Sequence, residues 1–389
     1  MVNSNKDLIV CKFGGSSIAA EPQSGSIKQI LERNRKRRVV VVSAPGKSVK
    51  YSKKVTDLLI EAYSAKGEFD KIMNEVQVRF DEFATGLGVH SIDISREIKK
   101  IKRYFRLFHN KSYLLSRGEY LTAKIFAVYL NATFIDSAKL IKFNRVGKIL
   151  GCTYKKIQTK IKNKQLVVIP GFYGSNIFGK IKVMSRGGSD ITGTIVSKAV
   201  NVKIYENWTD VSFIESDYFD KGKSTPILHI SYRDMRFLSF FGASVLHYKS
   251  SSMLFDGLTM IRNTQKPRII GTLIKNNCRR LKFAHTMRKA TEIEINDTKR
   301  IQKLLKRLHA DVLYKQSVMG NLVVAFCTSL GYLSQKDYDE LISQAHKVRY
   351  VYVHAYIVSN KKRKNNILLM NNQDKILHID DCKFLIVKD

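Results

Sequence analysis

Short apolar runs alternate with stretches of helical periodicity from Asp7 to about Ile274, and this alternation limits the fold more than any other feature of the chain. Apolar residues return every three or four positions in three stretches, which predicts helices at residues 56–85, 119–130 and 189–200. We expect strands at residues 8–13, 39–42, 133–136, 166–169 and 202–205. The alternation is typical of an α/β domain built on a largely parallel sheet.

A different order of elements follows after Ile274 and a basic, less patterned stretch. Six segments are expected to form strand, helix, strand, strand, helix and strand at residues 291–295, 299–308, 311–318, 321–328, 338–347 and 349–358. This βαββαβ order predicts a ferredoxin-like antiparallel α+β domain. Three more short strands, which would complete or extend that sheet, are expected at residues 366–370, 375–379 and 383–387. We therefore divide the chain into a larger domain, 1–275, and a smaller domain, 276–389.

Composition excludes several classes of protein. The apolar runs are shorter than the roughly 18 residues that span a bilayer, and the first residues lack the pattern of a signal peptide. The five cysteines form no C-x-x-C pair, so neither a zinc site nor a disulfide framework is indicated. We expect a cytoplasmic protein with reduced thiols and no membrane association.

The formal net charge of +35 by itself favours a polyanionic partner, because basic surfaces attract phosphates at long range. The basic runs are scattered, however, and no single basic arm or recognition helix emerges from residues 33–38, 99–106, 155–164 and 361–364. We interpret this charge as solvated surface, and a nucleic-acid partner is not favoured.

Lys12 is the second residue of the first motif that carries chemistry, CKFGGSS at residues 11–17. A lysine at a strand end, followed by two glycines and two hydroxyls, suits the phosphates of a nucleotide, because glycines let phosphate oxygens approach the backbone closely. A tight strand-to-helix turn, in which the glycines only supply positive φ, is an equal alternative.

Two further motifs carry candidate ligands. In VMSRGGSDITG (183–193), Arg186 can grip a carboxylate through two hydrogen bonds, Ser189 can cap a helix, and Asp190 can hold a metal or a lysine. In YENWTDVS (205–212), Thr209 and Asp210 stand at the end of a strand, where ligands of open α/β sheets bind.

Glu119 follows a Ser-Arg-Gly turn at the start of a predicted helix, where a favourable interaction with the helix dipole is the simpler explanation. Trp208 and His247 are interpreted as packing residues and are left out of the site.

These segments occur in a specific order, and together the sequence resembles the aspartate kinase family of the amino acid kinase superfamily, in particular its monofunctional bacterial branch. The resemblance runs from Ile9 to about Ile274 and is carried by VCKFGGSS, VVVVSAPGK, SRGEYLTA, IPGFYGS, SRGGSDITGTIVSKAV, YENWTDVS and GASVLHYKS. It implies a three-layer α/β/α catalytic domain followed by a shortened ACT-type domain. It also implies a homo-oligomer that uses ATP and Mg²⁺ to phosphorylate L-aspartate, the first step toward lysine, threonine and methionine.

The resemblance also implies roles for single residues. Lys12 and Asp190 would be catalytic, with Lys12 neutralising charge on the moving phosphoryl group and Asp190 organising lysine and metal. The ATP-binding residues would be Lys12, Phe13, Gly14, Gly15, Thr209 and Asp210. The aspartate-binding residues would be Thr56, Glu119, Arg186 and Ser189. No residue is assigned directly to the metal.

The sequence departs from the family pattern in two places. Where the family has D-P-R, whose arginine helps to grip nucleotide phosphates, this chain has Tyr218, Phe219 and Asp220, and Lys221 or Lys223 is a candidate substitute. The first strand-to-helix junction of the smaller domain, EINDTKRI at 294–301, lacks glycine, which predicts reduced feedback inhibition by lysine or threonine.

Two alternatives remain open. One is a kinase of the same superfamily that acts on glutamate, acetylglutamate or a nucleoside monophosphate. The other is a catalytically weakened protein that acts as a binding module.

Overall fold

The chain folds into two compact units in the computed structural model. The first unit contains the residues up to 214 together with 245–277, and the second contains 215–244 together with 278–389. The structure describes residues 8–388 except 20, 66, 185–186, 219, 252–254, 279–280, 296–304, 306–310, 319–320, 328–338, 340–341, 344, 346 and 372–373. The sequence analysis divides the chain once, near residue 275, whereas the structure groups residues 215–244 with the C-terminal unit. The roles assigned to the two domains stay a prediction.

A mostly parallel sheet forms the centre of the first unit. Within this unit its strands lie in the order β13-β12-β8-β1-β2-β5-β3, in which the β12–β13 pair is antiparallel and the other neighbouring pairs are parallel. The strands of this unit are β1 (Ile9–Phe13), β2 (Arg37–Val42), β3 (Thr133–Phe134), β4 (Lys142–Phe143), β5 (Val167–Pro170), β6 (Tyr173–Asn176), β7 (Ile181–Val183), β8 (Ile204–Thr209), β12 (Leu258–Asn263) and β13 (Leu273–Ile274). A separate small sheet has the order β4-β6-β7. The predicted parallel α/β sheet is therefore confirmed, and each of the five predicted strands overlaps an observed one.

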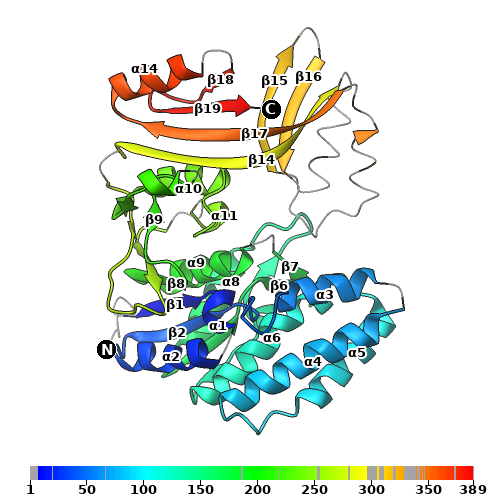
Figure 1. Ribbon diagram of the computed structural model, residues 1–389. Coiled ribbons are helices and arrows are strands. Elements are labelled where there is room, and N and C mark those ends of the chain that lie inside the picture. Colours follow the sequence, from blue (N-terminus) through cyan, green and yellow to red (C-terminus); the bar gives the residue numbers. More distant parts are fainter. Residues whose placement is uncertain are drawn as a thin grey trace. The chain divides into compact units, whose positions relative to one another are not determined.

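Helices cover both faces of this sheet, which makes the unit three-layered. Figure 1 shows α8 and α9 on one side and α2 and α6 on the other. Right-handed crossovers explain this, because the chain passes from β1 to β2 and then to β3 in one direction, and returns from β3 to β5 and β8 in the other. The helices are α1 (Gly15–Ile18), α2 (Glu21–Glu32), α3 (Val55–Ser64), α4 (Phe69–Gly86), α5 (Ile94–Phe108), α6 (Lys111–Tyr129), α7 (Ser137–Leu140), α8 (Cys152–Ile161), α9 (Gly188–Val200) and α11 (Tyr248–Ser251).

Two of the predicted helices have different boundaries in the structure. The helix predicted at 56–85 is two helices, α3 and α4, separated near Gly67, whose φ of +87° favours glycine and ends helical geometry. The helix predicted to start at Glu119 starts at Lys111, because the Asn110 side chain caps it by accepting a hydrogen bond from the Tyr113 N–H. Helix α9 agrees with the prediction to within one residue.

The second unit is built on an antiparallel sheet with the order β15-β16-β14-β17-β19-β18. The four strands predicted in the βαββαβ order are confirmed, although β14 begins eight residues earlier than expected, within the stretch interpreted as unpatterned. The helix predicted at 299–308 lies outside the described residues except for Leu305, and half of the residues of the helix predicted at 338–347 also lie outside them. The elements of this unit are β11 (His229–Ile230), α10 (Tyr232–Phe240), β14 (Phe283–Ile295), β15 (Asp311–Val318), β16 (Asn321–Cys327), β17 (Lys347–Val358), α14 (Lys361–Met370), β18 (Lys375–His378) and β19 (Lys383–Lys388). The short strands β9 (Ile214–Glu215) and β10 (Pro226–Ile227) pair with each other, and a 3₁₀ turn, η2 (Lys221–Lys223), lies between them.

Each face of this second sheet has its own apolar cluster. On one face, Val351, Val353 and Leu385 pack with Phe237 and Phe240 of α10. On the other face, Phe384 and Ile386 pack with apolar residues of α14. The prediction of a strand at 366–370 is therefore wrong: Asn360 caps a helix through the Arg363 N–H, and the apolar residues 367 and 368 of that helix cover the sheet. The strands predicted at 375–379 and 383–387 are confirmed as β18 and β19, which extend the sheet.

Candidate active site

Strands β1 and β8 are neighbours in the sheet, and the chain leaves them in opposite directions. From β1 it continues to β2 on one side, and from β8 it continues to β12 on the other. In open α/β sheets, ligands bind at the carboxyl ends of such a strand pair, where the connections diverge. Lys12 and Phe13 end β1 and are in register with Asn207 and Trp208 of β8.

Lys12 is buried in a polar cluster at this point. Its Nζ lies 2.7 Å from Oδ1 of Asp190, near the start of α9, and 3.3 Å from Oδ1 of Asn207. The Asn207 Nδ2 donates to Asp190 Oδ1 (3.2 Å), and the backbone N–H of His247 donates to Asp190 Oδ2 (3.0 Å). These contacts hold a buried ammonium group in one place at the carboxyl edge of the sheet. We call Lys12, Asp190 and Asn207 the site cluster.

The Gly14–Gly15 turn packs directly against the chain that follows β2. The Gly14 N–H donates to the Trp208 carbonyl (3.0 Å), and the Gly15 carbonyl accepts from the Gly46 N–H (2.9 Å). A Cβ atom at Gly15 would lie 2.9 Å from the Ala44 oxygen, and one at Gly46 would lie 2.6 Å from the Gly15 carbonyl carbon. Gly14 has φ −72°, so it is not needed there for left-handed geometry. At Gly15 the requirement is close backbone approach.

Glu119 lies in the middle of α6 and is not at a helix start as predicted. It is buried, and its Oε2 has no hydrogen-bond partner in the described part of the chain. Burial raises the pKa of Glu119 to about 8, although backbone N–H groups of Glu119 and Ala44 and the charge of Arg117 lower it. Gly118 permits this arrangement, since a Cβ there would lie 2.8 Å from the Ala44 Cβ. The result is a buried carboxyl group with an unused acceptor atom.

Thr209 and Asp210 follow the end of β8, as predicted. The Thr209 hydroxyl donates to Asp210 Oδ1 (2.9 Å), and the Thr209 carbonyl accepts from the Thr264 N–H (2.9 Å). The Thr264 hydroxyl lies 2.5 Å from the Ser17 hydroxyl of α1. Hydrogen bonds therefore connect the ends of β8 and β12 with the Gly14–Gly15 turn.

The remaining predicted residues differ in how the structure presents them. Thr56 is the second residue of α3 and is half-buried. Ser189 is buried against Gly171 and does not cap α9, because Gly187, with φ +73°, occupies the N-cap position. Arg186 lies outside the described residues.

Of the residues that replace D-P-R, Phe219 lies outside the described residues, and Tyr218 and Asp220 belong to the second unit. Burial raises the pKa of Tyr218 to about 12. Lys223, a candidate substitute for the arginine, forms an ion pair with the neighbouring Asp220 carboxylate at 3.2 Å.

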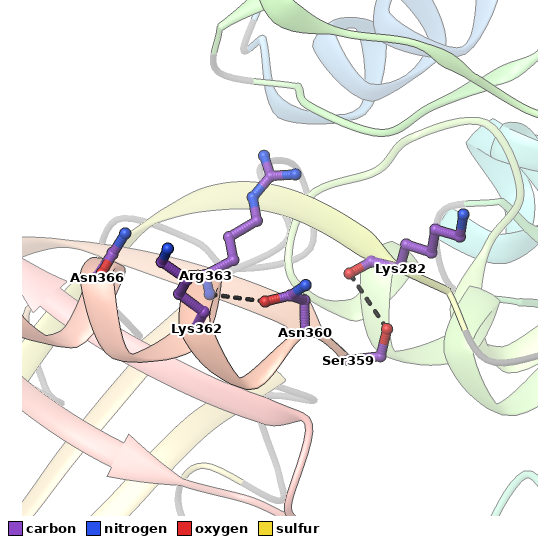
Figure 2. Close-up of a pocket in the computed structure, with 6 residues that line it drawn as sticks. All are labelled: Lys282, Ser359, Asn360, Lys362, Arg363 and Asn366. Atoms are coloured by element: carbon purple, nitrogen blue, oxygen red, sulfur yellow. Dashed lines mark hydrogen bonds between the residues drawn. The ribbon is translucent and has the colours of Figure 1, made fainter.

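The second unit has a surface pocket of its own, shown in Figure 2, lined by Lys282, Ser359, Asn360, Lys362, Arg363 and Asn366. The polar groups there close the start of α14: the Asn360 side chain accepts from the Arg363 N–H (2.9 Å), and the Ser359 hydroxyl donates to the Lys282 carbonyl (3.5 Å). The Arg363 guanidinium lies over the Phe283 ring at 3.6 Å. These contacts explain the residues as helix capping and packing.

Asn207 and Gly46 are the site residues that the sequence analysis missed. Asn207 is two residues before Thr209 and therefore lies on the same face of β8, a signal that strand parity provides. His247, interpreted as a packing residue, does pack its ring over Gly187, but its backbone N–H also supports Asp190. Trp208 is fully buried and stacks on Phe13 at 5.9 Å, as expected for packing.

Across the ranges that the structure describes, neither a membrane-spanning helix nor a three-ligand metal cluster is found. No helix among the described residues combines the length and the apolar character needed to cross a bilayer. In the same part of the chain, no three or more His, Cys, Asp or Glu side chains gather as a metal-binding group.

Comparison with known proteins gives consistent results. The model of the amino acid kinase family matches residues 7–262. Aspartokinase 3 of Bacillus subtilis is 34% identical over 292 residues, which cover 68% of this chain and 63% of that protein. Aspartokinase 1 of Arabidopsis thaliana chloroplasts is 26% identical over 292 residues, covering 68% of this chain and 51% of that protein. The chain thus spans less than two thirds of the length of these curated relatives.

Solved structures match over nearly the whole chain. Aspartate kinase from Clostridium acetobutylicum has a TM-score of 0.76 at 29% identity, with 98% of this chain and 96% of that chain covered. Escherichia coli aspartokinase III in complex with aspartate and ADP has a TM-score of 0.80 at 19% identity, with the same coverage. At that lower identity, the second likeness shows the fold alone.

Proposed function

Because the chain belongs to the amino acid kinase family, whose model matches residues 7–262, we propose that it is an aspartate kinase. The proposed reaction moves the γ-phosphoryl group of ATP to the side-chain carboxylate of L-aspartate and forms ADP and 4-phospho-L-aspartate. The observation that carries the proposal is the buried Lys12, held by Asp190 at 2.7 Å where the connections that leave β1 and β8 diverge. The likeness to aspartokinases in sequence and in fold supports the choice of substrate.

The site cluster suits phosphoryl transfer, in which the protein mainly positions the reactants and stabilises charge. The acceptor carboxylate has an ordinary pKa of about 4, so it is ionised at neutral pH and needs no general base. We assign to Lys12 the neutralisation of the moving phosphoryl group and to Asp190 the positioning of Lys12. Phe13, Gly14 and Gly15 would line the phosphates, and Thr209 and Asp210 the rest of the nucleotide site.

Glu119 is the proposed partner of the α-ammonium group of aspartate. Its buried carboxyl group has an unused oxygen and a pKa raised to about 8, so a cation that enters the site would both fill the acceptor and favour ionisation. Arg186 would pair with the α-carboxylate, and Thr56 and Ser189 would complete the aspartate site. The roles of Arg186, Thr56 and Ser189 rest on the sequence motifs.

Magnesium is proposed to enter with ATP, whose phosphate oxygens would supply most of its ligands. This fits the described residues, which contain no group of three acidic or imidazole ligands, since Mg²⁺ in such sites keeps waters and binds one or two carboxylates. The metal would add charge neutralisation between the phosphates. We assign no residue to it.

The second unit is proposed to act as a shortened ACT-type regulatory and oligomerisation domain, with a homodimer as the smallest assembly. Its antiparallel sheet and the family resemblance support this proposal. The glycine-free junction at 294–301 suggests weak feedback control, and strong inhibition by millimolar lysine or threonine would refute that part. The product would enter the route to lysine, threonine and methionine.

The test is formation of aspartyl phosphate that depends on ATP and magnesium, trapped as the hydroxamate, with glutamate as the alternative substrate. Aspartate-specific product that is lost in Lys12→Ala is the expected result. A chain that binds ATP but makes no product at saturating substrates would support the alternative, a weakened binding module. Product from glutamate instead of aspartate would place the chain elsewhere in the superfamily.

A further inference from the structure

The segment from Ala44 to Val55 touches two parts of the candidate active site, the Gly14–Gly15 turn and the part of α6 that carries Glu119. Ala44 packs against Gly118, the residue before Glu119, and the Gly46 N–H donates to the Gly15 carbonyl at 2.9 Å. The segment then leads to Val55, whose N–H donates to the Pro45 carbonyl, and to Thr56 at the start of α3. A displacement of this segment would therefore move the proposed phosphate-binding and aspartate-binding residues together.

Arg79, in α4, holds this segment at two points that lie seven positions apart in the sequence. Its NH1 donates to the Lys53 carbonyl at 2.6 Å, and its NH2 donates to the Gly46 carbonyl. The guanidinium also lies over the Tyr51 ring, 4.6 Å from its centre. One side chain thus binds both ends of the turn formed by residues 46–53.

The burial of Arg79 is costly, which argues that its position has a purpose. The residue is 2% exposed, and burial lowers the pKa of its guanidinium. Among the described residues it forms no ion pair, and its Nε has no hydrogen-bond partner. A buried cation is normally paired with a carboxylate. An apolar side chain would fill the same space without this penalty, but it could not bind two backbone carbonyls.

The other side-chain contacts of residues 50–53 lie near the surface and are weaker. The Tyr51 hydroxyl and the Lys50 ammonium both bind Glu82, and Lys53 binds Glu61, in each case through exposed side chains. Exposed ion pairs contribute little, because water and salt screen them. Arg79 is therefore the main fixed point of this segment.

We propose that Arg79 is a positioning residue, which rests on the function proposed above: it fixes residues 44–55 so that Gly46 supports the Gly14–Gly15 turn and Ala44 stays packed against Gly118, next to Glu119. Arg79 touches neither substrate in this account. It acts through the backbone of the segment. Its loss makes residues 44–55 more mobile without removing a residue that contacts a substrate.

The test compares Arg79→Met and Arg79→Lys with Arg38→Met. Arg38 is a matched control, because its guanidinium also donates to two backbone carbonyls, those of Lys164 and Gln165, outside the candidate site. The first readout is hydrogen exchange of peptides covering residues 44–55, and the second is the KM and kcat for aspartate and ATP. Addition of methylguanidinium to the Arg79→Met protein is the third.

For Arg79→Met we expect faster hydrogen exchange that is confined to residues 44–55. We also expect the KM for aspartate to rise about tenfold, because even small misplacements of the groups that bind and position a substrate are costly. Methylguanidinium should partly reverse both the faster exchange and the raised KM. Arg79→Lys, which keeps the charge but cannot bind both carbonyls well, should lie between. Arg38→Met should change neither readout.

Other outcomes separate this inference from the proposed function. Wild-type exchange and wild-type KM in Arg79→Met would overturn the role of Arg79, whatever the reaction. Absence of aspartyl phosphate from the wild type would refute the aspartate kinase proposal, while hydrogen exchange would still decide whether Arg79 fixes the segment. If Arg79→Met fails to fold, the exchange and kinetics of Arg79→Lys decide, and an unchanged lysine variant overturns the inference.

Discussion

Two buried ionic clusters lie on opposite faces of the same pair of strands. The site cluster comprises Lys12, Asp190 and Asn207. The second, which we call the support cluster, is built around Glu206 and also contains Arg37, Trp208 and Arg262. Because side chains alternate along a strand, neighbouring residues of β8, Glu206 and Asn207, belong to different clusters.

The buried carboxyl groups of Glu206, in the support cluster, and of Glu119 differ in how completely their oxygens are used. In the support cluster, Glu206 accepts two hydrogen bonds from Arg37, at 2.7 and 3.0 Å, and one from the Trp208 indole at 2.9 Å, with Arg262 at 3.4 Å. Glu119 of α6, which belongs to neither cluster, keeps an oxygen without a hydrogen-bond partner among the described residues. A buried carboxylate whose oxygens are both bound by protein donors stabilises the fold, whereas a buried carboxyl group with an unused oxygen can take a ligand. Four predictions test this contrast, in order of expected size.

The largest effect is expected from Lys12→Met, which keeps the apolar stem and removes the charge. Turnover should fall by about a thousandfold, as on removal of a donor that stabilises transition-state charge. Stability should fall less than in the Arg37 variant described next, because Asp190 keeps hydrogen bonds from Asn207 and the His247 backbone. Hydroxamate formation and urea unfolding measure the two effects. A large loss of stability with turnover intact would reverse the roles of the two clusters.

Arg37→Met tests the support cluster and should lower stability by about 3–5 kcal/mol, the usual result of leaving a buried carboxylate without its partner. The folded fraction should keep turnover within a few-fold of wild type, because Arg37 contacts no residue of the site cluster. Arg38→Met, on the same strand, should cost only about 1 kcal/mol, since its partners are carbonyls. Equal losses from Arg37 and Arg38 would show that the Glu206 pair adds nothing special.

Sequence reasoning predicted the strand-end positions of several candidate residues, because the signals for these positions are local. Lys12, Gly14 and Gly15 follow one apolar strand, and Thr209 and Asp210 follow another. Parallel strands bring such residues to one edge of the sheet, so the alternation of elements predicted their common position.

The features that sequence reasoning missed depend on distant partners. Arg79 binds a carbonyl 33 residues away, and Glu206 binds Arg37 across 169 residues, and neither pairing has a local pattern. Glu119 was predicted at a helix start because a glycine, Gly118, precedes it and glycine is unfavourable within helices. In the structure Gly118 lies inside α6, where close packing against Ala44 leaves no room for a Cβ atom. The grouping of residues 215–244 with the C-terminal unit likewise rests on tertiary packing.

Glu119 offers a pH test of unused polar capacity. Its pKa in the folded protein is raised to about 8, so the folded state holds a proton that the unfolded chain releases above about pH 4.3. The stabilising contribution is complete below the unfolded pKa and is lost as pH rises toward 8, with a slope approaching about 1.4 kcal/mol per pH unit. Glu119→Gln should abolish this slope.

Unfolding by urea between pH 5 and 8 measures the difference between wild type and Glu119→Gln. Saturating aspartate should flatten the wild-type slope, because an ammonium group beside Glu119 favours its ionised form. The same pH slope in both proteins would contradict the burial of an ionisable group at this position.

The smallest effect is expected from Asn207, and it tests whether the site cluster is more than a simple ion pair. Asn207 accepts from Lys12 at 3.3 Å and donates to Asp190 at 3.2 Å, so Asn207→Leu removes both contacts and leaves the 2.7 Å pair in place. Hydrogen bonds of this kind contribute about 1–1.5 kcal/mol, which corresponds to about a tenfold loss of turnover.

Asn207→Asp keeps the acceptor for Lys12 but sets a second carboxylate beside Asp190. Repulsion between the two should raise the pKa of one of them and make turnover fall at low pH, when a shared proton releases Lys12. If both variants turned over like wild type at every pH, the buried pair of Lys12 and Asp190 would be sufficient, and the contrast between the clusters would rest on Lys12 alone.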